Sequence, residues 1–237
     1  MASSLADWKP VPLPLRAPMH GRTVALEPLD AEFHAADLWR AVQERDHVWQ
    51  WLSDGPFASE AAFTASIAAK QSAPDAVFYA ILSEEIAYPP APRSTEAALR
   101  PGVALGYASF MRMDPAHGVI EVGNILLAPT LQRTTAATEA MYLMARHVFE
   151  HGYRRYEWKC NVENLPSRRA AERLGFTFEG IFRQHMVIKG RNRDTAWFAM
   201  LDSEWPTRKA AFEAWLDPAN FAADGRQKRS LATCATG

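Results

Sequence analysis

The chain has only two cysteines among its 237 residues, Cys160 and Cys234, and neither stands in a C-x-x-C or similar metal-ligand spacing. A disulfide framework and a cysteine-based metal site are therefore excluded, no resident metal is expected, and a reducing cytoplasm is the predicted location. No window approaches 18 uninterrupted apolar residues and the N-terminus lacks an apolar h-region, so neither a membrane span nor a secretion signal is predicted.

An excess of charge of one sign is also lacking. The 26 Lys and Arg residues nearly cancel the 27 Asp and Glu residues, which leaves no global basic field of the kind that nucleic-acid binding needs. The G-x-G-x-x-G pattern of nicotinamide enzymes and the Gly-Lys-Thr loop of nucleotide triphosphatases are both missing. These absences set aside nucleic acid as a partner and two large classes of enzyme.

What is present suffices for one large core, because 48% of the residues are hydrophobic. Residues 1–20 form a proline-rich arm, in which prolines at alternate positions remove backbone donors and favour an extended chain. Residues 21–205 are predicted as the folded domain, with 86–101 as an inserted surface loop because they combine Pro and Ser without helical or strand periodicity. Residues 206–237 complete the chain as a C-terminal helix and a polar tail.

Strands and helices follow one another along the domain. Apolar periodicity and turn residues predict strands over 22–28, 77–82, 103–113, 119–127, 155–160, 178–188 and 195–201. Helices are predicted over 30–41, 59–67, 136–148, 164–174 and 205–216. This order favours a single α+β domain, a mixed α/β arrangement with helices flanking one sheet.

Two stretches are the most specific: 119–127, which reads VIEVGNILL, and 161–176, which contains an Asn-x-x-Ser helix start and ends in Leu-Gly-Phe. In these motifs and in the order of its elements, the chain from Gly21 to Trp205 resembles the GNAT superfamily of N-acetyltransferases, particularly its ribosomal-protein N-terminal acetyltransferase-like branch. The resemblance implies a mostly antiparallel twisted sheet, splayed between the two strands that hold acetyl-coenzyme A.

The same resemblance implies an enzyme that transfers an acetyl group directly from acetyl-coenzyme A to a primary amine. The acceptor is either the N-terminal amine of a protein or a small-molecule amine, and the chain acts as a monomer or a homodimer. A different interpretation is a catalytically degenerate acyl-coenzyme A sensor or a protein-interaction domain. That alternative is motivated by two departures from the family pattern, at Thr135 and Ala171.

The resemblance also implies which residues bind the cofactor. The turn before the central helix follows a Gln/Arg-x-x-Gly-x-Gly/Ala pattern in the family, and its amides bind the pyrophosphate. Here Thr135 replaces the middle glycine, and a β-branched residue resists positive φ and close approach to a phosphate. The helix N-terminus still attracts an anion. The implied cofactor-binding residues are Leu126, Leu127, Ala128, Gln132, Arg133, Thr134, Thr135, Ala136, Ala137, Asn164 and Ser167.

Two residues are candidates for the chemistry. Glu121 lies on the strand beside the acetyl group in this resemblance, and apolar neighbours are expected to suit it as a base for the amine; a surface carboxylate is the competing interpretation. Ser167 is the candidate donor of a proton to the coenzyme A thiolate, because Ala171 stands where many family members have a tyrosine. Asn164 and Ser167 are equally compatible with an ordinary helix cap and first turn. Weaker candidates for the base are His117, His185 and Asp114.

An acceptor pocket is predicted from aromatic residues, since such side chains shape a cleft and hold a cation over a ring face. The candidates are Trp49, Trp51, Phe57 and Tyr79. Burial in the core is the competing interpretation for all four.

Overall fold

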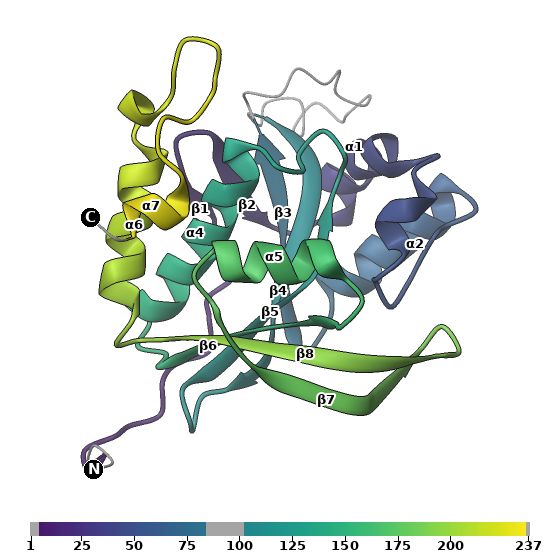
Figure 1. Ribbon diagram of the computed structural model, residues 1–237. Helices are drawn as coiled ribbons and strands as arrows, with labels where there is room; N and C mark the ends of the chain where they lie inside the picture. The colour runs from purple at the N-terminus through teal and green to yellow at the C-terminus, as the bar shows by residue number, and fades with distance from the viewer. Residues whose placement is uncertain (1–4, 84–101, 236–237) are drawn as a thin grey trace.

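The computed structural model describes residues 5–83 and 102–235 of the chain (Figure 1). An eight-stranded sheet in the order β1-β2-β3-β4-β5-β6-β8-β7 forms its centre. Neighbouring strands are antiparallel except β5 and β6, which run parallel. The strands are β1 (Met19–His20), β2 (Val24–Pro28), β3 (Ala76–Ser83), β4 (Val103–Asp114), β5 (Val119–Leu127), β6 (Arg155–Asn161), β7 (Thr177–Ile188) and β8 (Arg191–Leu201).

Helices flank this sheet, so the predicted mixed, mostly antiparallel α+β fold is confirmed. They are α1 (Ala31–Val42), α2 (Glu60–Gln71), α4 (Thr135–Glu150), α5 (Leu165–Arg173), α6 (Trp205–Leu216) and α7 (Leu231–Cys234), with short 3₁₀ turns η1 (Asp46–Trp49) and η2 (Pro218–Asn220). Side-chain oxygens of Asp30, Ser59, Thr134 and Asn164 accept amide hydrogens in the first turns of α1, α2, α4 and α5. These caps satisfy amides that have no partner within the helix, and they fix where each helix begins.

The two faces of the sheet are covered by different helices. Phe110 and Met111 are neighbours on β4, so their side chains point to opposite faces. The Phe110 ring stacks on His147 of α4 and contacts Tyr156 of β6, whereas Met111 lines a cavity with residues of α2. Helices α4 and α5 therefore cover one face, and α2 lies against the other. In Figure 1, α4 and α2 lie on opposite sides of the strands β3 and β4.

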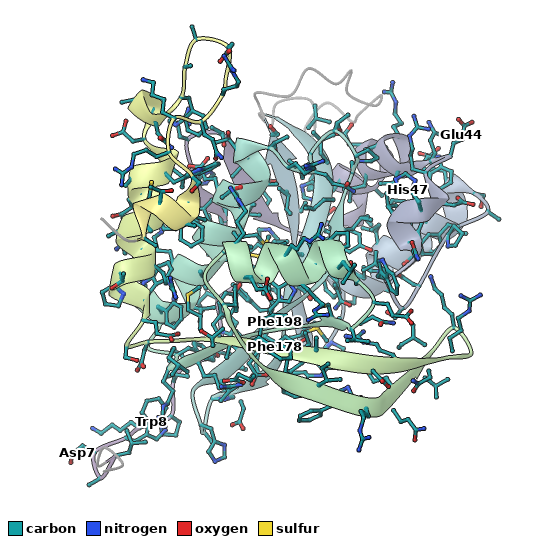
Figure 2. The ribbon with its side chains drawn as sticks, in the orientation of Figure 1. Asp7, Trp8, Glu44, His47, Phe178 and Phe198 are labelled. Carbon is teal, nitrogen blue, oxygen red and sulfur yellow. The ribbon has the colours of Figure 1, made fainter. Side chains whose placement is uncertain are left out.

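A long β7–β8 hairpin extends the sheet beyond β6. Phe178 and Phe198 pack together within it, with ring centroids 5.4 Å apart (Figure 2). The hairpin turns at Lys189 and Gly190, whose φ values are 48° and 72°; positive φ at both central residues is typical of a tight type I′ turn. The turn is thus shorter than the predicted polar segment 189–193, because β8 already begins at Arg191.

Both ends of the described chain pack onto the domain. In the N-terminal arm, the carbonyl of Pro12 accepts a hydrogen bond from the Tyr153 hydroxyl at 3.0 Å, and that of Leu15 accepts one from Tyr79 at 2.7 Å. At the other end, Glu213 of α6 accepts a hydrogen bond from Tyr142 of α4 at 2.9 Å. The predicted surface loop over 86–101 lies outside the described residues. Within the described ranges, none of the helices has the length and apolar character needed to cross a bilayer.

Candidate active site

The sheet opens between its two parallel strands. Strands β5 and β6 pair only from Val119 opposite Arg155 to Val122 opposite Trp158. Beyond Val122 they diverge, while β5 keeps its pairing with β4 through a bulge and Asn124 takes a φ of 50°. Since the Leu126 and Leu127 segment has β4 on one side and no strand on the other, half of its backbone polar groups face the gap. The predicted splay is present.

The direction of each backbone amide over residues 126–128 decides which of them can donate a hydrogen bond to a ligand in the gap. The Ala128 amide donates to the Leu105 carbonyl of β4 at 2.8 Å, so it is not free, contrary to the expectation for this residue. Directions alternate along an antiparallel pair, and the register sets Leu126 opposite Tyr107 and Leu127 opposite Gly106. The Leu127 amide consequently points into the gap, whereas that of Leu126 is directed at β4.

Helix α4 begins at one end of this gap. Thr134 is its N-cap: the hydroxyl accepts from the Ala137 amide at 3.1 Å and donates to the Leu131 carbonyl at 2.7 Å. The Thr134 hydroxyl and the Ala137 amide are therefore engaged with each other, and their contact with a phosphate stays a prediction. The Thr135 and Ala136 amides precede the first helical hydrogen bond, from Thr138 to Thr134, and these two remain for an anion.

Thr135 in place of glycine does not distort this turn. Within the described part of the chain, Thr135 is not among the residues with positive φ, and it is the first residue of α4. The positive φ falls instead on Arg133, at 63°. The expected conflict between a β-branched side chain and a left-handed backbone is thus absent at position 135. Gln132 is bonded through its side-chain amide to the Leu127 carbonyl at 3.0 Å, which ties the turn to β5.

Helix α5 begins on the β6 side of the gap. Asn164 caps it, accepting the Ser167 amide at 3.1 Å. The Ser167 hydroxyl oxygen accepts a hydrogen bond from the indole N–H of Trp158 on β6 at 3.0 Å. Its own hydrogen is directed at the neighbouring sulfur of Cys160. Cys160 lies beside this hydroxyl; burial raises the pKa of its thiol, and the Ser167 hydrogen bond opposes that rise, so the thiol is a structural neighbour and a poor nucleophile.

Glu121 lies in an environment different from the expected apolar one. Its carboxylate accepts hydrogen bonds from Arg112 at 2.9 and 3.0 Å and pairs with Lys159 at 2.9 Å. Lys159 also pairs with Glu157 at 2.7 Å and lies 3.7 Å from the centroid of the Trp197 ring. The carboxylate is thus almost fully enclosed between two cations, whose strands β4 and β6 flank β5. Its oxygens are already occupied by strong donors.

The part of the chain that forms the gap also matches a known protein family. Residues 23–177, more than half of the sequence, match the family described as Acetyltransferase (GNAT) domain. The chain belongs to the GNAT acetyltransferase family. The gap between β5 and β6, the amides that open α4 and the Asn-x-x-Ser start of α5 are accordingly the parts of a GNAT fold that the resemblance assigned to the cofactor.

Solved GNAT structures agree closely with this one. A GCN5-related N-acetyltransferase from Brucella melitensis is 46% identical, covers 98% of this chain and 100% of its own, and has a TM-score of 0.89. A probable acetyltransferase of the GNAT family from Chromobacterium violaceum ATCC 12472 is 40% identical, with 87% and 96% covered and a TM-score of 0.75. The ribosomal-protein-serine acetyltransferase of Escherichia coli (strain K12) is 29% identical over 102 residues, 42% of this chain and 56% of that protein. The chain therefore matches little more than half the length of this curated relative.

The weaker candidates for the base lie in two places. His117 and Asp114 pair with each other at 2.8 Å in the exposed β4–β5 turn, next to the first residue of β5 and away from the gap. The hydrogen bond from His117 lowers the pKa of Asp114. His185 lies beside the Glu121 cluster, with its Nδ1 2.9 Å from the Thr195 hydroxyl. Burial and the nearby cations Arg112, Arg193 and Lys159 lower its pKa, so its imidazole is neutral at neutral pH.

Three of the four aromatic residues predicted for the acceptor pocket pack in the core or against it. Trp49 and Tyr79 are core residues; the Trp49 ring packs edge-on against Phe57 and Phe63. None of the four lines a cavity that lies beside α2 on the sheet face opposite α4. Core packing, the competing interpretation, describes Trp49, Phe57 and Tyr79. Sequence patterns missed the cavity residues Asp54, Lys70 and Tyr107, because these come from three separate elements and share no local motif.

Proposed function

We propose that this chain is an acetyl-coenzyme A-dependent N-acetyltransferase that transfers the acetyl group directly to a primary amine. The observation that carries the proposal is the gap between β5 and β6, with the free amides of Thr135 and Ala136 at one end and the Ser167 hydroxyl on its β6 side. A cofactor lying in this gap has its pyrophosphate at the start of α4 and its thioester beside β5.

Binding of the cofactor is assigned to backbone groups more than to side chains. The Leu127 amide supplies a donor in the gap, and the Thr135 and Ala136 amides supply two at the pyrophosphate. Arg133, exposed at the same turn, adds a positive charge. The side-chain amide nitrogen of Asn164 remains to meet a carbonyl of the pantetheine arm, since the Asn164 oxygen is used by the Ser167 amide.

The chemistry requires bond and proton changes that balance. An amine that binds as an ammonium ion first loses one proton to solvent. The amine nitrogen then attacks the thioester carbon and bonds to it, the carbon–sulfur bond breaks, and a second amine proton is lost to solvent while the thiolate gains one. We assign protonation of the thiolate to Ser167, whose oxygen is held by Trp158 and whose hydrogen turns from the Cys160 sulfur to the thiolate when the cofactor is bound. The proton that the amine loses returns through solvent to the Ser167 oxygen. The first turn of α5 also favours negative charge on the sulfur.

In this proposal Glu121 is not the base that takes a proton from the amine. Held by Arg112 and Lys159, its carboxylate is better suited to orient these two side chains beneath the acceptor than to accept a proton. An amine of a protein, which the name ribosomal-protein-serine acetyltransferase indicates for the Escherichia coli relative, and a small amine are both compatible with a thioester in the gap between β5 and β6.

A thermal-shift titration tests the cofactor, because a ligand that binds only the folded state raises the melting temperature. Acetyl-coenzyme A is expected to give a saturable shift that ATP and NAD do not give. Release of free coenzyme A thiol in the presence of amines then tests turnover. A shift without turnover of any amine would favour the degenerate acyl-coenzyme A sensor, and no shift at millimolar acetyl-coenzyme A would remove the proposal.

A further inference from the structure

A cavity of about 310 Å³ lies between α2, the segment that follows η1, and the sheet. Its volume is at the lower end of the range for small-molecule sites. The lining combines an apolar wall with a few polar groups: Leu52, Ser53, Asp54, Ser66, Ala69, Lys70, Ala73, Asp75, Ala76, Phe78, Tyr107, Met111 and Asn124. Asn124 belongs to β5, directly after the residues at which β5 and β6 part, so one end of the cavity reaches the proposed acetyl group.

The Tyr107 hydroxyl is the first sign that this cavity binds a ligand. The side chain is 1% exposed, yet its hydroxyl has no hydrogen-bond partner within the described part of the chain. A buried hydroxyl without a partner costs free energy of about 1–3 kcal/mol. Burial, and then the negative charge of Asp54, raise the pKa of Tyr107 well above its usual value. The hydroxyl thus stays protonated near a carboxylate, and a polar group of a ligand could supply the missing hydrogen-bond partner.

The Asp54 carboxylate has a free oxygen. Its Oδ2 pairs with Lys70 and accepts a hydrogen bond from Ser66 at 3.2 Å. Within residues 5–83 and 102–235, Oδ1 has no hydrogen bond or ion pair. Lys70 is itself held by Ser66 at 2.7 Å and lies 5.6 Å from the Tyr107 ring centroid. The pair is largely enclosed, with 15% of the Lys70 and 31% of the Asp54 side chain exposed, so the charge of Asp54 is only partly screened by solvent.

Asn124 presents a second oxygen at the gap. Its side-chain nitrogen donates to the Ser109 hydroxyl at 3.1 Å and approaches the Met111 sulfur at 3.5 Å. These contacts orient the amide so that its oxygen remains for a donor. A protonated amine carries three N–H groups, and the cavity offers oxygens of Asp54, Asn124 and Tyr107 as acceptors.

The charge of the lining selects among amines. Two carboxylates, Asp54 and Asp75, face one ammonium, Lys70. Arg112 is not part of the lining and is occupied by Glu121. We propose that this cavity binds the acceptor amine as an ammonium ion between Asp54, Asn124 and Tyr107, and that it takes primary amines whose neighbouring oxygen group is uncharged. The inference rests on the proposed acetyltransferase function.

Ethanolamine and glycine are suitable probes, because their amines have similar basicity and they differ in a hydroxyl against a carboxylate. Turnover is measured as thiol release with the full chain and acetyl-coenzyme A. The kcat/KM for ethanolamine is expected to exceed that for glycine by about tenfold or more, since two like charges a few ångströms apart repel by more than the free energy of a tenfold change.

Substitution of Asp54 reverses the expected selectivity. Asp54→Asn removes the charge that holds the ammonium and leaves Lys70 without its partner, so the kcat/KM for ethanolamine falls about tenfold and the preference shifts towards glycine. An unchanged preference in this variant would overturn the inference. So would a wild-type enzyme that binds acetyl-coenzyme A but prefers glycine, or turns over neither probe.

Tyr107 and Tyr156 provide a matched pair. Both hydroxyls are buried and lack a partner among the described residues, but Tyr156 packs against Phe149 and Phe176, away from the cavity. Tyr107→Phe is expected to raise the KM for ethanolamine about threefold to tenfold with no loss of thermal stability, while Tyr156→Phe leaves KM unchanged. Equal effects in the two variants would overturn the role of Tyr107. Because an acetyl-coenzyme A thermal shift is measured for every variant, loss of cofactor binding is told apart from loss of amine binding.

Discussion

The indole N–H of Trp158 donates a hydrogen bond to the hydroxyl oxygen of Ser167 over 3.0 Å. This contact joins β6 to the first turn of α5 across the edge of the gap that we assign to the cofactor. It also fixes which way the hydroxyl hydrogen can point, because the oxygen's lone pair is directed at the indole. A serine that caps or opens a helix is common, but one oriented in this way by a buried tryptophan is prepared to donate.

Replacement of Ser167 by alanine tests this arrangement. We expect kcat to fall about tenfold to a hundredfold, because proton transfer from a positioned group contributes at least that much to a rate, while the KM for acetyl-coenzyme A changes little. Steady-state thiol release measures both constants. The control is Ser59→Ala, which removes the cap of α2 at a cost of about 1 kcal/mol in stability and lies away from the gap. Equal kcat values in wild type and Ser167→Ala would assign Ser167 to structure alone.

Glu121→Gln is expected to act first on stability. The substitution leaves the buried Lys159 with one counter-ion fewer and Arg112 with none at that site, and breaking a buried pair costs about 3–5 kcal/mol. Urea unfolding monitors the loss. The double variant Glu121→Gln with Lys159→Met removes the stranded charge and is expected to recover part of the stability. A variant that keeps full stability but loses turnover would instead support the catalytic base predicted from the sequence.

Some of the fold was predictable because local signals determine it. The strand Val119–Leu127 was predicted with its observed ends, since its apolar run is bounded by Gly118 and by Ala128-Pro129. The helix Trp205–Leu216 was predicted equally well. The start of β8 was missed, because Arg191, Asn192 and Arg193 are polar residues in an exposed hairpin, where the tight turn and not the apolar pattern decides the pairing.

The same distinction holds for the candidate site: features set by a local motif were predicted, and contacts between distant segments were not. The cap formed by Asn164 and the position of Ser167 follow from a motif within four consecutive residues. The partners of Glu121 come from the two neighbouring strands, and the proximity of Asp54 to Tyr107 depends on how α2 and the segment before it pack on the sheet. No local pattern encodes such proximity, so the apolar environment expected for Glu121 was wrong and the cavity was not foreseen.

Thr135→Gly tests whether the family's glycine would improve the phosphate turn. Thr135 already has a helical backbone, so glycine relieves no strain, and in a helix it loses more backbone entropy than threonine does. We expect the affinity for acetyl-coenzyme A to stay within about threefold of wild type, and stability to fall by about 0.5 kcal/mol. Titration calorimetry and urea unfolding measure the two quantities. A tenfold gain in affinity would show that Thr135 obstructs the pyrophosphate.

His147 gives the domain a predictable dependence on pH. Burial, followed by the charges of His151 and Arg146, lowers the pKa of its imidazole from 6.5 to about 4, and its Nε2 is buried without a partner among the described residues. In the unfolded chain the imidazole takes up a proton as the pH falls below about 6.5, whereas in the fold it stays neutral until about pH 4. The unfolded state thus binds more protons between these values, and stability falls as the pH drops through this window.

The size and origin of this effect are measurable. Unfolding free energies from urea titrations at pH 7 and pH 4.5 are expected to differ by about 1–2 kcal/mol on account of His147, less than the full pKa difference implies because the ring is partly exposed. His147→Phe retains an aromatic ring against Phe110 and is expected to flatten the dependence by that amount. His47→Asn, at an exposed position in η1, is the control and keeps the wild-type slope. A slope unchanged by His147→Phe would assign the acid sensitivity to other groups, because the proton uptake that drives it would then occur elsewhere in the chain.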